Sequence, residues 1–174
     1  LLIGLNRDWL SPEPGEVIAR FVEDALARTQ NESGTPIAEL RRALLALSEA
    51  MLSARELSPS WAFIEGAGLS ESQMQGLKQL VRQAELIRTE GPSSAQQLRF
   101  RHDRLRDWLL SEAALALMAE DAFSDELLAD PLLAEVVGLT LVRSSAPKWI
   151  VARAATHGPL RSFMRGAWRR QTRF

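Results

Sequence analysis

A histidine and an aspartate stand together where a short strand pattern gives way to a helical one. The strand pattern is Leu98-Arg99-Phe100, His102 and Asp103 follow it, and helical spacing of apolar residues begins at Leu105. Backbone N–H groups at a helix N-terminus favour bound anions, which an imidazole can share. His102 is therefore a candidate anion-binding residue. The alternative is structural: Asp103 is a helix N-cap or first-turn acid, and His102 packs locally.

The sequence lacks the motifs of the common catalytic and metal-binding sites. It has no Gly-x-x-x-x-Gly-Lys-Ser/Thr phosphate loop, and its only lysines are Lys78 and Lys148. It contains no cysteine, which excludes disulfides, thiol nucleophiles and cysteine-ligated zinc. The other histidine, His157, precedes Gly158-Pro159 and is expected at a helix C-terminus. We therefore expect this chain itself to catalyse nothing and to hold no metal or cofactor.

The composition is typical of a helical globular protein. Hydrophobic residues make up 46% of the 174 positions, enough for a core, and the aromatic share is only 6%. Leu, Ala, Arg and Glu dominate, which favours helix over sheet. No apolar run approaches the ~20 residues of a membrane span. The missing cysteine fits a reducing compartment, so we expect a cytoplasmic piece of a longer protein with no membrane contact.

Periodicity and turn signals predict the elements that position His102. Helical stripes cover residues 16–29 and 37–55, with residues 30–36 as a linker, and Ser60 caps a short helix. Ser70 and Gln73 form a capping box for a helix ending near residue 83. Residues 86–88 and 98–100, around a Gly/Pro/Ser-rich stretch, predict a hairpin. The expected fold is mainly α: a winged helix-turn-helix with one small β-hairpin, flanked by helical segments.

We divide the chain into a helical lid-like segment (1–34), a winged-helix domain (35–119) and a helical extension (120–174) that could begin a helical repeat. The extension is expected to contain helices over 125–143, interrupted near Pro131, and over 148–156 and 159–170. Residues 107–142 carry eight acidic and no basic residues, and 143–174 carry eight basic and no acidic ones. These two stretches are expected to pack together; a separate acidic partner is the alternative.

The segment around His102 resembles the His-Asp motif that closes the winged-helix domain of STAND-class signalling NTPases. It is also similar to the Phe-x-His pattern of the NACHT branch. The matching positions are Phe100, His102, Asp103, Leu105, Arg106-Asp107 and Trp108-Leu109. Position 101 is Arg where plant resistance proteins of this class commonly have Met, and an acidic residue later in the NACHT helix has no clean counterpart. The resemblance therefore leaves the branch of the class open.

The resemblance implies a regulatory segment of a bacterial-type nucleotide switch. His102 would contact the β-phosphate of ADP and stabilise the resting state, with Phe100 and Asp103 in support. ADP or ATP with Mg would belong to the parent protein, a P-loop ATPase. Its upstream NTPase core and downstream sensor repeats would be the partners of this chain, and activation would involve oligomerisation.

A winged-helix DNA-binding or protein-adaptor module is the alternative function. A winged helix that binds DNA places its third helix in the major groove. The predicted third helix, residues 71–83, offers Lys78 and Arg82 but begins with Glu71. That is a weak set of contacts for bases and phosphates, so we do not expect nucleic acid to be the partner.

Overall fold

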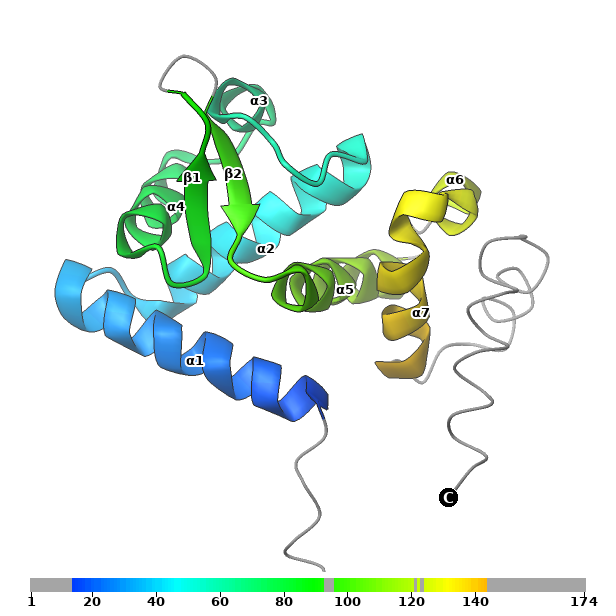
Figure 1. Ribbon diagram of the computed structural model, residues 1–174, viewed down its shortest axis with the longest axis horizontal. Helices are drawn as coiled ribbons and strands as arrows, with labels where there is room; N and C mark the ends of the chain where they lie inside the picture. Colours follow the sequence, from blue (N-terminus) through cyan, green and yellow to red (C-terminus); the bar gives the residue numbers. More distant parts are fainter. Residues whose placement is uncertain (1–13, 93–95, 121, 123, 144–174) are drawn as a thin grey trace, which may run out of the picture.

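Figure 1 shows the computed structural model, which describes residues 14–92, 96–120, 122 and 124–143. Within these ranges the chain is mainly helical with a small antiparallel hairpin, which confirms the predicted fold class. The helices expected over 148–156 and 159–170, and His157, lie outside them. In chain order the elements are α1 (Pro14–Ser33), α2 (Ile37–Ala54), α3 (Trp61–Gly66), α4 (Glu71–Gln83), β1 (Ile87–Glu90), β2 (Gln97–Phe100), α5 (Asp103–Ala119), α6 (Asp125–Ala129), the 3₁₀ helix η2 (Pro131–Leu133) and α7 (Ala134–Arg143).

The helices α2, α3 and α4 and the hairpin follow one another in the order of a winged helix-turn-helix. β1 and β2 pair antiparallel with Ile87 opposite Phe100. On the other edge of β2, Gln97 forms an isolated bridge with Ser60, the residue before α3. The hairpin is thus bonded to the start of the second helix of the motif, while β1 packs beside α4.

Two helix starts form as the cap residues predict. The hydroxyl of Ser70 accepts a hydrogen bond from the N–H of Gln73 at 3.3 Å. The Gln73 side chain accepts in return from the N–H of Ser70 at 2.8 Å, which completes the capping box. Ser60 accepts from the N–H of Phe63 at 3.1 Å and opens α3. These caps fix the ends of the two helices that flank the small sheet.

The linker predicted over residues 30–36 is mostly wrong. α1 continues to Ser33, and only three residues connect it to α2. Polar side chains there mark solvent exposure and do not break a helix; the break comes at Gly34, whose φ is +74°. The side chain of Gln30 then accepts a hydrogen bond from the N–H of Ile37 at 2.9 Å, tying the two helices together.

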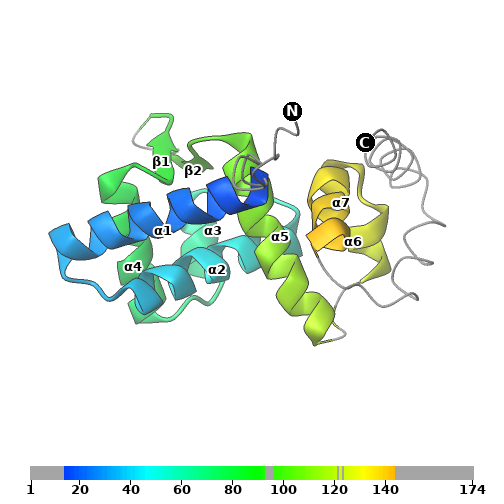
Figure 2. The same ribbon diagram turned by 90° about the horizontal axis from the view of Figure 1, so that it is seen from below.

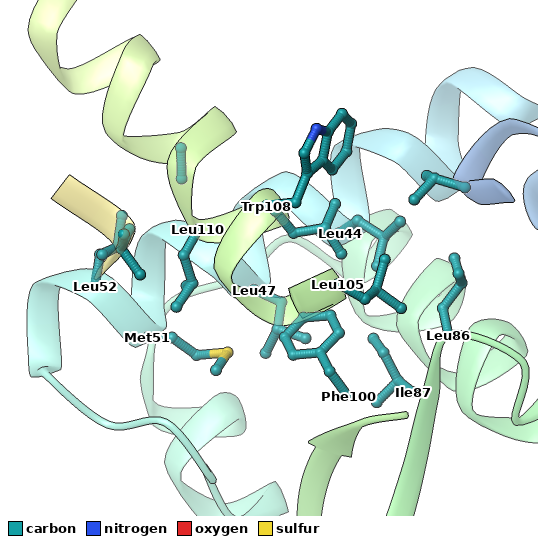
Figure 3. Packing of buried hydrophobic residues seen from close by; sticks show 14 of the residues in the cluster. Leu44, Leu47, Met51, Leu52, Leu86, Ile87, Phe100, Leu105, Trp108 and Leu110 are labelled. Atoms are coloured by element: carbon teal, nitrogen blue, oxygen red, sulfur yellow. The ribbon is translucent and has the colours of Figure 1, made fainter. Parts of the chain in front are cut away.

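One apolar cluster joins these elements, and α5 runs through it. Figure 3 shows Phe100 from the hairpin and Leu105 from α5 beside Leu47 from α2. α1 adds Val22 and Leu26 to the same cluster. α7 packs on the other side of α5, as Figure 2 shows.

Of the domain boundaries predicted from sequence, residue 34 lies in the α1–α2 connection and residue 119 is the last of α5.

Candidate functional site

His102 is the N-cap of α5, between the end of β2 and the first helical residue, Asp103. Its backbone is extended, with φ −141° and ψ 140°, and its carbonyl accepts from the N–H groups of Leu105 and Arg106, each at 3.1 Å. The imidazole is exposed and makes no capping hydrogen bond. N-cap side chains ordinarily accept from an N–H in the first turn. The His102 ring therefore leaves that helix end open to another acceptor.

Phe100 supports this junction from beneath. Its side chain is only 8% exposed and lies among Leu47, Ile87 and Leu105 (Figure 3). The residue after it, Arg101, is exposed, in keeping with the alternation of side chains along a strand. Phe100 thus anchors the end of β2 in the core, two residues before His102, and its ring faces away from the surface where a ligand would bind.

Asp103 is a first-turn acid and not the N-cap. Its carboxylate accepts from the guanidinium of Arg106 at 3.0 Å. Arg106 also pairs with Asp107 at 2.8 Å. Burial raises the pKa of Asp107, and the hydrogen bond from Arg106 opposes that rise. Two acids therefore pair with Arg106, and the carboxylate of Asp103 lies beside His102 with its charge offset by this arginine.

The cations that remain at the junction are Arg101 and Arg104. Both are exposed, on either side of His102 and Asp103, and neither has a side-chain hydrogen bond or ion pair to the described residues. Arg99, further up the strand, is paired with Glu90 at 3.2 Å. The junction thus combines two arginines, an imidazole and the N-terminus of a 17-residue helix. Each of these favours an anion.

A second notable cluster joins α5 to α7. The guanidinium of Arg143 lies 4.8 Å from the centre of the Trp108 ring. It also donates to the hydroxyl of Ser111 and forms an ion pair with Glu112. Arg143 is the first residue of the basic stretch, and its ion pair with Glu112 is one contact of the kind predicted between the two stretches. The rest of the basic stretch lies outside the described residues, as do the aromatic residues Trp149, Phe163, Trp168 and Phe174.

The structure contains a groove that sequence reasoning missed. It has a volume of about 790 Å³ and lies between the C-terminal half of α2, α3 and the start of α4. Its charged lining residue is Glu49, on α2. The available sequence signal was a row of small residues one helical turn apart, Ala46, Ala50 and Ala54, beside the leucine stripe of α2.

The exposed face of α4 is the surface that a DNA-binding winged helix would use. Lys78 and Arg82 are exposed on it. A small depression lined by Gln79, Arg82 and Glu32 lies between this helix and the end of α1. Glu32 brings an acidic side chain to the C-terminal end of α4, and Glu71 is exposed at its N-terminal end. Carboxylates at both ends of that face disfavour contact with DNA phosphates.

Searches of protein-family models, curated proteins and solved structures gave no match to this chain. In the described residues, no group of three or more His, Asp or Glu side chains is arranged to hold a metal ion. Over the same residues, no helix has the length and hydropathy of a membrane span. The site must therefore be judged on its own geometry.

Proposed function

We propose that the chain is the winged-helix and adjoining helical segment of a STAND (NACHT-like) signalling NTPase in the cytoplasm, and that it stabilises the ADP-bound resting state. The observation that carries the proposal is the position of His102. It caps a long helix directly after the wing, and its exposed ring forms no capping bond. Arg101 and Arg104 on either side of it form no side-chain hydrogen bond or ion pair with the described residues. The segment itself carries out no chemistry.

The proposed mechanism is differential binding of two nucleotide states. In the resting state the N-terminal N–H groups of α5 and the imidazole of His102 share the β-phosphate of ADP, which the upstream P-loop core holds together with Mg. Exchange for ATP favours an open state in which α5 has moved away. A ligand shifts such an equilibrium only by its difference in affinity for the two states. The contact with His102 is proposed to supply part of that difference.

The packing of α5 supports this role, because a switch needs a rigid element that carries the contact. α5 is held by the core on one side, and Arg143 of α7 binds its middle on the other. Movement of the nucleotide contact would therefore displace α7 as well. In this proposal α7 relays the change to downstream sensor repeats, and the active form oligomerises.

The test uses the intact parent protein with His102→Ala. Loss of one charge-assisted hydrogen bond is expected to cost about 1.5–3 kcal/mol of ADP-state stability. This corresponds to roughly a ten- to hundredfold shift toward the open form. ADP dissociation, measured with a fluorescent ADP analogue, should accelerate, and basal signalling should rise. Arg99→Ala, which removes a neighbouring cation already paired with Glu90, should change neither. Unchanged ADP retention in His102→Ala would show that His102 is a structural residue.

A second candidate function is a DNA-binding or adaptor module. The observation in its favour is the winged-helix order of α2, α3, α4 and the hairpin. That candidate predicts that duplex DNA binds α4 and that Lys78→Ala weakens the binding uniformly across sequences. Fluorescence anisotropy with labelled duplexes at several salt concentrations separates the two functions. Salt-dependent binding lost in Lys78→Ala but kept in His102→Ala would replace the nucleotide-switch proposal.

A further inference from the structure

The groove between α2 and α3 has the shape of a seat for another segment of chain. Ala46, Ala50 and Ala54 present a row of methyl groups along one wall. On the opposite rim Gly66 has no side chain, and even a Cβ built there would meet no atom within 4 Å. Small residues on both sides let a second backbone approach closely. The complete lining is Ala46, Glu49, Ala50, Ser53, Ala54, Ala62, Phe63, Gly66, Ala67, Gly68, Leu69 and Gln73.

The electrostatics of the groove favour a cation. Glu49 is half-buried in the wall, and none of the described residues offers it a hydrogen bond or an ion pair. Burial raises the pKa of Glu49, and the nearby carboxylate of Glu120, at the end of α5, raises it further. Among the described residues, no lysine or arginine lines the groove to offset these two acids. A desolvated carboxylate is stabilised when an opposite charge comes close to it.

The chain contains a segment with the complementary charge. Residues 144–174 carry seven lysine and arginine side chains and no acidic ones: Lys148, Arg153, Arg161, Arg165, Arg169, Arg170 and Arg173. The residue just before this segment, Arg143, already pairs with Glu112 of α5. The same helix carries Glu120, the acid next to the groove. The segment therefore begins beside α5, the helix whose C-cap residue Glu120 acts on Glu49.

We propose that the groove between α2 and α3 binds the basic segment 144–174 of this chain, with a lysine or arginine of the segment paired to Glu49. Attachment to the same chain gives the segment a local concentration in the millimolar range, so a modest contact suffices. A segment of this length reaches on the order of 100 Å when extended, far more than a domain of this size requires. The proposal does not depend on the function assigned to His102.

The test measures the distance between the groove and the segment in the full chain. Because the sequence has no cysteine, Ser72→Cys, at an exposed position of α4 outside the groove lining, and Ser162→Cys accept two nitroxide labels without competing thiols. Pulsed electron paramagnetic resonance should give a narrow short-distance component. Glu49→Lys should abolish that component and Glu49→Gln should reduce it. Glu65→Lys, at an exposed acid of α3 outside the groove, should preserve it.

Circular dichroism measures whether each variant is folded. If Glu49→Lys is unfolded, the short-distance component in Glu49→Gln tests the proposal instead. Absence of the short component in the unsubstituted groove overturns the proposal. So does its persistence in the Glu49 variants. A mixture of chains labelled only at residue 72 with chains labelled only at residue 162 provides the last control. A short distance in that mixture means that the segment of a second copy fills the groove, which also overturns the proposal.

Discussion

The arginines at the N-terminal end of α5 and the arginine that contacts its middle have opposite surroundings. At the N-terminal end, Arg101 and Arg104 flank His102 in solvent, and none of the three is paired with a described side chain. In the middle of the helix, Arg143 reaches across from α7 to the Trp108 ring and the Glu112 carboxylate. The guanidinium of Arg143 is mostly buried, with 23% of its side chain exposed. Water can solvate the three side chains at the N-terminal end. The guanidinium of Arg143 loses most of that solvation, so protein groups must accept its hydrogen bonds.

The comparison separates residues that hold the fold from residues that are free to bind. Removing a partner from a half-buried network leaves polar groups unsatisfied, so the α5–α7 contact is sensitive to substitution. Removing an exposed side chain at the junction leaves the fold almost unchanged. A residue is a candidate for function when it contributes little to stability at a position where another residue type would contribute more. The predictions below measure this contrast.

The largest effect is expected for Trp108→Ala. Trp108 is 7% exposed in the core and provides the ring on which Arg143 lies. Its removal should cost about 3–5 kcal/mol of unfolding free energy, because a large cavity forms beside α5. Chemical denaturation of both proteins measures the loss. Trp108→Phe keeps a ring under Arg143 and should cost clearly less; equal losses in the two variants would show that ring stacking and volume are unimportant.

Arg143→Ala should have the next largest effect, about 1–3 kcal/mol, since it removes the ring contact and the hydrogen bonds to α5 together. A double-mutant cycle with Glu112→Gln isolates the ion pair. We expect the double variant to be less destabilised than the sum of the single variants, as measured by denaturant unfolding. Simple additivity would mean that the pair contributes nothing and that the two helices are held by apolar packing.

The fold could be predicted from the sequence where the signals are local. The capping box at Ser70, the start of α3 at Ser60 and the hairpin that ends at Phe100 rest on residues a few positions apart. The strand-to-helix junction at His102 belongs to the same class, because strand and helix periodicities meet there. What the pattern left open was the capping residue, which is His102 and not Asp103.

The remaining features depend on residues far apart in the chain. Arg143 and Glu112 are 31 positions apart, and Arg28 and Glu85 are 57 apart. No single-sequence pattern specifies which of many exposed charges will meet after folding. The groove at Glu49 is likewise created by packing α3 against α2, and its alanines read in the sequence as ordinary helix formers. Tertiary packing, not local preference, determines these sites.

His102→Ser tests the exposed half of the comparison. Serine at an N-cap accepts a first-turn hydrogen bond that the imidazole does not make, so this variant should be more stable by about 0.5–1 kcal/mol. Ser70→Ala is the matched control, because it removes the capping bond at the start of α4. It should lose about 0.5–2 kcal/mol. Thermal and denaturant unfolding measure both changes. A loss of stability in His102→Ser would show that the ring supports the fold.

The smallest effect is expected for the exposed ion pair between Arg28 of α1 and Glu85, two residues before β1. Arg28 donates to both carboxylate oxygens of Glu85, with distances from 2.6 to 3.0 Å. This hydrogen bonding lowers the pKa of Glu85, and the charge of Arg101 lowers it slightly more. Because half of the Arg28 side chain is exposed, solvent screens the pair, and Glu85→Gln should cost only about 0.2–1 kcal/mol at neutral pH.

The pH dependence of that small loss identifies its source. The pKa of Glu85 is lower in the folded state than in the unfolded chain. Its contribution is therefore fully present above the unfolded-state pKa and disappears as the pH falls through the lower folded-state value. Urea unfolding from neutral to acid pH should show the parent and Glu85→Gln curves converging in acid. A difference that stays constant with pH would assign the loss to packing. Convergence would assign the loss to the ionised carboxylate of Glu85 and its hydrogen bonds from Arg28.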